Sequence, residues 1–348
     1  MRAAAGSAPV SAPPWWRPSI AGAALQRAIE AAQAQDRCAL ATYLPVGYPD
    51  RIRGMDALHL LAQTADVIEL GVPYAAGGFD GPVIQKASRT ALAEGFRMDD
   101  LFAAARELSA TSASSTAALL VMSYWQPIHA YGPGRFAARA AAAGISGVLV
   151  PDLPVEEAGP WLDAAHSAGL AAIPRVSPPT APDRLAAIAA AATGMVYAPA
   201  TDGVTGNPQP ISPRLPGLVA QLRSLTSLPI AAGIGISTPA QARTAATWAD
   251  LVVIGSAVIR RMHAQPNAPA DAAAAAARDF IDAIRQTPAP WADWWPALGA
   301  RQHHCALRPA EDRRIETPST HSRLGTTLPG WHEHGPACTN SSATRRDR

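Results

Sequence analysis

Two carboxylates lie close together in the sequence but in contrasting local settings. Glu69 stands within an apolar run from Val67 to Val72, and Asp80 follows eleven residues later in a glycine-rich turn. Apolar surroundings disfavour a charged carboxylate, so we expect a raised pKa at Glu69, in the range that suits proton transfer. Asp80, in a polar loop, is expected to stay ionised. Two acids with separated pKa values can supply acid and base chemistry at one site, although a single glutamate at a strand end is more often structural.

Short apolar segments alternate with alanine-rich helical patterns over most of the chain. The predicted strands are Cys38–Tyr43, Asp66–Leu70, Ala117–Met122, Gly147–Val150, Ala171–Val176, Met195–Ala198, Pro229–Ala232 and Leu251–Ile254. The predicted helices are Ile20–Gln35, Pro82–Glu94, Asp99–Leu108, Gly134–Ala143, Val155–Ala168, Ala181–Ala192, Arg214–Leu225 and Pro239–Thr247. Continuous apolar strands are typical of parallel sheets buried on both faces. Repeated β–α units over roughly 250 residues predict a (β/α)₈ TIM barrel. A doubly wound open sheet is the alternative, but it more often has fewer strands and a glycine-rich first turn.

Composition divides the chain into three parts. Residues 1–18 are predicted to be a flexible N-terminal extension, residues 19–298 the barrel, and residues 299–348 a disordered C-terminal tail rich in Arg, His, Thr, Ser and Pro. The cluster of Trp291, Trp294 and Trp295 is expected to close the last helix onto the barrel.

Charge and cysteine usage limit the classes of partner and compartment. The formal net charge of +2 over 348 residues gives no reason to expect a nucleic-acid or membrane-surface partner. Three scattered cysteines, Cys38, Cys305 and Cys338, fit a reducing compartment better than a disulfide framework. The first residues lack the apolar segment of a secretory signal, and no long apolar span is present. We therefore expect a cytoplasmic protein.

Glycine-bearing turns follow the last three predicted strands. The residues concerned are Thr205, Gly206, Gly235, Gly255 and Ser256. Glycine lets backbone N–H groups approach an anion, and a following helix N-terminus favours it. Because barrels commonly bind phosphate after strands seven and eight, these turns predict a phosphate site. Tyr43, Tyr124 and Tyr197, at or just beyond strands one, three and six, are equally plausible as walls for a flat ring or as core aromatics.

The residues that are missing exclude several mechanisms. The only lysine, Lys86, lies within a predicted helix, which argues against a Schiff-base aldolase. The histidines fall in the tail, on helices or in an unrelated loop, so no metal-ligand set is expected. No dinucleotide fingerprint follows the first strand. We therefore expect acid–base chemistry on a phosphorylated substrate without metal or cofactor.

Several motifs together resemble the alpha subunit of tryptophan synthase. They are Glu69-Leu-Gly-Val-Pro-Tyr74, Asp80-Gly-Pro-Val-Ile-Gln85, Pro151-Asp-Leu-Pro-Val-Glu-Glu157, Gly203-Val-Thr-Gly206, Gly233-Ile-Gly-Ile-Ser237 and Gly255-Ser-Ala257, in the family's order between Ala24 and Arg261. The resemblance implies retro-aldol cleavage of indole-3-glycerol phosphate to indole and glyceraldehyde 3-phosphate. It also implies a pyridoxal-phosphate beta subunit as partner, in an alpha2-beta2 heterotetramer, that takes up the indole. In the family the residue matching Glu69 is the acid–base group, and the one matching Asp80 holds the indole N–H.

The chain departs from the family pattern in its loops. Ala75-Ala76-Gly77 stands where the family usually has Ser-Asp-Pro, and Phe79, Gln126 and Thr201 stand where it usually has alanine, asparagine and arginine. We expect weaker coupling to a beta subunit, which Ala75→Ser, Ala76→Asp and Gly77→Pro together should increase.

Two other functions are compatible with these departures. They are a stand-alone indole-3-glycerol phosphate lyase that releases free indole, and a catalytically weak alpha-like partner of a beta subunit. A phosphosugar isomerase is disfavoured because aspartates are missing at the ends of strands one and five, where Tyr43-Leu44-Pro45 and Arg175-Val176-Ser177 stand.

Overall fold

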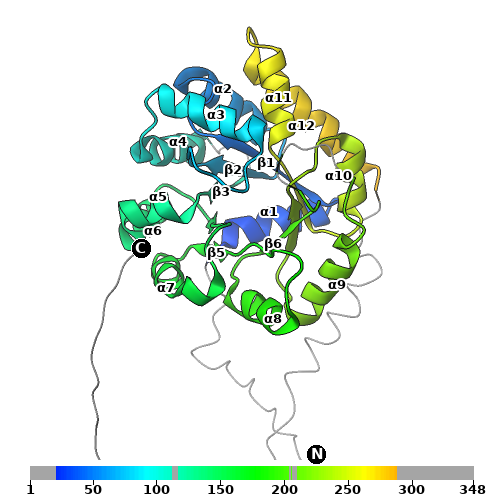
Figure 1. Cartoon of the computed structure of the whole chain (residues 1–348). Helices are drawn as coiled ribbons and strands as arrows, with labels where there is room; N and C mark the ends of the chain where they lie inside the picture. Colours follow the sequence, from blue (N-terminus) through cyan, green and yellow to red (C-terminus); the bar gives the residue numbers. More distant parts are fainter. Residues whose placement is uncertain (1–20, 112–116, 204, 206–209, 288–348) are drawn as a thin grey trace, which may run out of the picture. The chain divides into compact units, whose positions relative to one another are not determined.

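A computed structural model describes residues 21–111, 117–203, 205 and 210–287, which form a parallel barrel (Figure 1). Its eight strands are hydrogen-bonded in the order β5-β4-β3-β2-β1-β8-β7-β6. Strands β5 and β6 meet beyond the end of β5, where the Val176 amide donates to the Tyr197 carbonyl at 2.9 Å and the Tyr197 amide to the Pro174 carbonyl at 3.1 Å. The barrel is therefore nearly closed, which confirms the predicted TIM barrel and makes the open-sheet alternative wrong.

The strands lie close to their predicted positions, and all are buried. Their bounds are β1 Ala39–Pro45, β2 Val67–Gly71, β3 Ala118–Met122, β4 Gly147–Leu149, β5 Ala171–Ile173, β6 Val196–Pro199, β7 Ile230–Gly233 and β8 Leu251–Ile254. Strand β5 is shorter than predicted because regular pairing with β4 stops at Ile173.

Helices lie between the strands around the barrel (Figure 1). Their bounds are α1 Ala23–Gln33, α2 Arg51–Ala62, α3 Pro82–Ala93, α4 Met98–Thr111, α5 Trp125–Tyr131, α6 Pro133–Ala142, η1 Val155–Glu157, α7 Gly159–Ser167, α8 Pro182–Ala191, α9 Leu215–Leu225, α10 Pro239–Ala246, α11 Ser256–Ala264 and α12 Pro269–Arg285. Helices α2, α5, α11 and α12 are additional to the predicted set. The helix predicted over 155–168 is divided into η1 and α7, because Pro160 has no amide hydrogen to continue a single helix.

Proline sets where many of these helices begin. A proline occupies the first turn of α3, α6, α7, α8, α9, α10 and α12. Its fixed φ suits the first helical turn, where its missing amide hydrogen would have no partner within the helix. Helix α10 adds a capping box, in which the Thr238 side chain accepts from the Gln241 amide. The prolines thus set the residues at which these helices begin.

Two aspartates tie together the amino ends of neighbouring strands. Asp66 pairs with Arg37 through two contacts of 2.7 Å and accepts from the Leu40 amide at 2.8 Å. Asp250 pairs with Arg223 at 3.0 Å and accepts from the Ile230 amide at 2.8 Å. Each aspartate links an arginine to the backbone of a neighbouring strand, so this end of the barrel contributes to stability. The opposite, carboxyl end carries the pocket described below.

Parts of the sequence-based domain division lie outside the described residues. These are the predicted extension 1–18, the predicted tail 299–348, and the cluster of Trp291, Trp294 and Trp295. In the part that the structure describes, no helix has the length and apolar character needed to span a membrane.

Candidate active site

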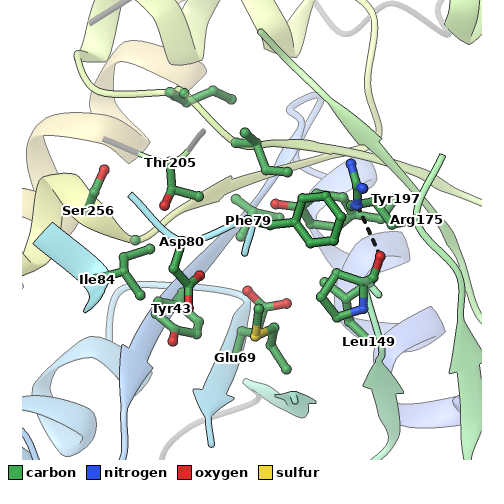
Figure 2. Close-up of a pocket in the computed structure, with 17 residues that line it drawn as sticks. Tyr43, Glu69, Phe79, Asp80, Ile84, Leu149, Arg175, Tyr197, Thr205 and Ser256 are labelled. Carbon is green, nitrogen blue, oxygen red and sulfur yellow. Dashed lines mark hydrogen bonds between the residues drawn. The ribbon is translucent and has the colours of Figure 1, made fainter. Parts of the chain in front are cut away.

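A pocket opens at the carboxyl ends of the strands (Figure 2). Its empty space is about 570 Å³ with the open mouth included. Most of the side chains and turns singled out from the sequence line it: Tyr43, Glu69, Asp80, Tyr197, Thr205, Gly235, Gly255 and Ser256. Tyr124 stands behind this wall, and Gly206 lies outside the described residues.

Glu69 is placed inside the barrel by the register of β2. It pairs with Tyr43 in β1 and with Leu120 in β3. The residue is 4% exposed, and its Oε1 has no hydrogen-bond partner in the described part of the chain. Burial, together with the nearby charge of Asp80, raises the pKa of Glu69 to about 8. A buried carboxyl that can hold a proton at neutral pH is suited to general acid catalysis.

Asp80 differs from the sequence-based expectation. It is 6% exposed rather than lying in a solvated loop, and burial raises its pKa to about 7. A hydrogen bond with Tyr124 acts in the opposite direction by stabilising the anion. The expectation of a polar setting is wrong because the loop after β2 folds inward over the barrel mouth. Burial therefore raises the pKa of both carboxyls, and the charge of Asp80 raises that of Glu69 further.

The loop that carries Asp80 is tied to two other loops at the residues on either side of Asp80. The Phe79 amide donates to the Tyr124 hydroxyl at 3.0 Å, beyond the end of β3. The Gly81 amide donates to Thr205 Oγ1 at 2.7 Å, in the loop after β6. Asp80 therefore lies between two anchored neighbours, and Tyr124 holds the loop.

The three tyrosines stay protonated, because burial raises the pKa of each hydroxyl above its ordinary value. Tyr43 and Tyr197 stand in the pocket wall, whereas Tyr124 packs against Tyr74 with ring centroids 5.5 Å apart. Tyr197 also makes a hydrogen bond with the backbone of Ile234. Neutral hydroxyls and ring faces suit contact with a flat aromatic ligand.

The turns after β7 and β8 have the features expected of an anion site. Ile234 and Gly235 have φ values of 58° and 92°, and a left-handed conformation is costly for a β-branched residue such as Ile234. Thr201 fills the space beside Gly235 and hydrogen-bonds the Ile234 carbonyl at 3.2 Å. Ser256 begins α11, whose first amide groups have no partners within the helix.

Sequence reasoning did not assign Phe79 and Arg175 to the site, although both line the pocket. Phe79 directly precedes Asp80. Arg175 follows the end of β5, and in a barrel any residue that follows a strand is a candidate for the active site. Their proximity to one another had no signal in the sequence. Across the described ranges, no group of three or more His, Cys, Asp and Glu side chains is arranged to hold a metal.

Comparison with known proteins places this site in a family. The family model of the tryptophan synthase alpha chain matches residues 29–285. The tryptophan synthase alpha chain of Thermobifida fusca is 43% identical over 262 residues, which are 74% of this chain and 94% of that protein. The alpha chain of Streptomyces coelicolor is 40% identical over 250 residues, 72% of this chain and 90% of its own length.

Solved structures agree with these relatives. A Mycobacterium tuberculosis tryptophan synthase structure has a TM-score of 0.69 at 36% identity, covering 75% of this chain and 98% of its own. An alpha chain from Legionella pneumophila has a TM-score of 0.67 at 31% identity, covering 75% and 97%. None of these findings favours the two alternative functions. The chain belongs to the tryptophan synthase alpha chain family, lyases that cleave indole-3-glycerol phosphate to indole and glyceraldehyde 3-phosphate in tryptophan biosynthesis.

Proposed function

We propose that Glu69 and Asp80 carry out this cleavage in the pocket. The reaction breaks the bond between indole C3 and the adjacent glycerol carbon. Glu69, protonated, gives its proton to C3, and the ionised Asp80 stabilises the positive charge that develops on the indole N–H. As the carbon–carbon bond breaks, the Glu69 carboxylate takes the proton of the glycerol hydroxyl. Indole and the aldehyde are released, and Glu69 regains its starting form.

The observation that carries this proposal is the state of the Glu69 carboxyl. It lines the pocket, is buried, and has an Oε1 without a hydrogen-bond partner in the described part of the chain. A buried polar atom without a partner is costly, and such costs in folded proteins are often associated with function. A structural carboxylate would have its oxygens satisfied, as those of Asp66 are by Arg37 and the Leu40 amide.

We assign the remaining pocket residues to two ends of the substrate. Thr205, Gly235, Gly255 and Ser256, with Gly206, bind the phosphate through hydroxyl and backbone donors. Tyr43 and Tyr197 contact the indole ring, and Tyr124 holds Asp80. Figure 2 places Ser256 and Thr205 on one side of Asp80 and Glu69, with Leu149 and Arg175 on the other. The indole ring therefore extends toward the apolar wall of Leu149 and Pro151.

We further propose that the chain works with a tryptophan synthase beta subunit, in an alpha2-beta2 assembly. Support comes from the Mycobacterium tuberculosis neighbour, which is described as a tryptophan synthase. The match covers 98% of that neighbour's chain, so the segments that form its surface have counterparts in this protein.

Replacement of Glu69 tests the proposal. Glu69→Gln keeps the shape of the side chain and removes the transferable proton, so indole release should fall by about 10²- to 10⁴-fold. Glu30→Gln, on the exposed face of α1, is the matched control and should retain wild-type turnover. Near-normal turnover of the Glu69 variant would show that the glutamate is structural. Each assay is run with and without a beta subunit, and formation of a complex is followed by analytical ultracentrifugation.

A further inference from the structure

Arg175 is a cation in the pocket wall that the proposed reaction does not use. It follows β5, is half-buried, and lies at the indole end of the pocket (Figure 2). Its Nε donates to the Pro151 carbonyl at 3.3 Å, the dashed line in that figure. None of the ion pairs found among the described residues includes it. Its Nη1 also donates to the Val176 carbonyl at 3.5 Å. With no carboxylate at ion-pair distance, the half-buried guanidinium calls for a further partner beyond these two carbonyls.

The partner is the ring of Phe79. The guanidinium carbon of Arg175 lies 3.9 Å from the ring centroid, well inside the range of a cation–π contact. The contact joins the end of β5 to the loop after β2, which are far apart in the sequence. It therefore adds a third attachment to a loop already held by Tyr124 and Thr205.

The position of Phe79 gives this contact a consequence for the site. Phe79 directly precedes Asp80, and its amide is fixed by the Tyr124 hydroxyl at 3.0 Å. With the backbone held on one side and the ring held on the other, rotation of the segment that presents the Asp80 carboxylate is restricted. Placement within a fraction of an ångström matters for a group that stabilises transition-state charge.

We propose that Arg175 is a positioning residue, which clamps Phe79 so that Asp80 meets the indole N–H and the indole end of the pocket stays closed. The proposal rests on the proposed roles of Asp80 and Glu69. Phe79 supplies an aromatic face where the family pattern has a small residue. Its contact with Arg175 takes the place of the contacts that a more polar loop would make.

A double-mutant cycle on indole release tests the clamp. Arg175→Met keeps the length of the side chain without its charge, and Phe79→Leu keeps an apolar side chain without its ring. Each single change should lower kcat/KM by roughly 2- to 30-fold, the range expected for a partly desolvated cation–π contact. Because Asp80 acts on developing charge, the loss should fall mainly on kcat rather than on KM. The double variant should be no worse than the poorer single variant.

Conservative variants and a matched control separate positioning from general packing. Arg175→Lys and Phe79→Tyr keep a cation and a ring, so each should recover most of the activity lost in the corresponding single variant. Arg135→Met removes a similar contact, 4.5 Å from the Tyr131 ring and outside the pocket wall, and should leave kcat/KM unchanged. Melting temperatures report whether each variant is folded.

The outcomes distinguish the clamp from the proposed function. Losses that multiply in the double variant, or wild-type kcat in both single variants, overturn the clamp. If the Glu69→Gln variant retains activity, the proposed function itself fails, whatever the clamp variants do. If Arg175→Met and Phe79→Leu both fail to fold, Arg175→Lys and Phe79→Tyr carry the test. Activity of these two variants well below that of a distant surface variant then counts against the clamp.

Discussion

Gly77 lies directly against Asp80. A Cβ placed on Gly77 would stand 2.6 Å from Asp80 Oδ2 and 2.7 Å from Cε2 of Tyr124. Separations under 3 Å require one group to move, either the buried carboxylate or the Tyr124 ring, which packs against Tyr74. Glycine at position 77 is therefore part of the arrangement that holds Asp80.

This contact gives position 77 a role that the sequence-based prediction of coupling does not consider. The family pattern alone suggests that Gly77→Pro, with its neighbours, would increase coupling to a beta subunit. The structure predicts that Gly77→Ala displaces Asp80 and lowers kcat at least tenfold. Gly78→Ala is the matched control, because a Cβ there meets nothing within 4 Å. Steady-state assays of the two variants test this prediction. Equal kcat values would show that the segment accommodates the Cβ without displacing Asp80.

The rate of indole release should have a bell-shaped dependence on pH. Asp80 must be ionised, and its pKa of about 7 gives a rate that rises as the pH passes that value. Glu69 must be protonated, and its pKa of about 8 gives a rate that falls above it. The maximum is expected between the two. The residual activity of Asp80→Asn should lack the acidic limb, whereas a wild-type rate that stays flat down to pH 5 would contradict these assignments.

Glu69 should also make folding stability depend on pH. Its pKa rises from about 4.3 in the unfolded chain to about 8 in the folded protein. Between these values the folded protein holds a proton that the unfolded chain has lost, so stability decreases as the pH rises through this window. Glu69→Gln removes that dependence, and its melting temperature relative to wild type should increase from pH 5 to pH 9. A constant difference across this range would show that the burial of Glu69 does not perturb its titration.

The assignment of the phosphate site predicts the effect of a negative charge at Ser256. Ser256→Asp places an anion where the phosphate is expected, at the N-terminus of α11, so affinity for glycerol phosphate should fall tenfold or more by calorimetry. Gly235→Asp is less informative, because any Cβ there would collide with Thr201. Ser237→Asp lies beyond the pocket wall and serves as the control. Unchanged affinity in Ser256→Asp would place the phosphate elsewhere.

The barrel should function without the ends of the chain. A fragment of residues 19–298 contains every described strand and helix, every pocket residue and the whole family match. Its melting temperature and indole release should equal those of the full chain. A drop of several degrees in melting temperature would show that residues 1–18 or 299–348 belong to the folded unit.

The sequence by itself determined the parallel barrel and part of the pocket wall. Continuous apolar runs identify strands buried on both faces, and in a barrel their carboxyl ends converge, so Glu69, Gly235 and Ser256 could be assigned to one site. Periodicity is a local property, and it is sufficient wherever the fold repeats the same β–α unit.

Only the tertiary structure decided what the loops do. The burial of Asp80, the contact between Arg175 and Phe79, and the close approach of Gly77 to Tyr124 each depend on residues that loops from different strands bring together. Loop conformation has no periodic signal in the sequence. The pKa of a carboxyl depends on which side chains exclude water from it, and no single segment contains that information.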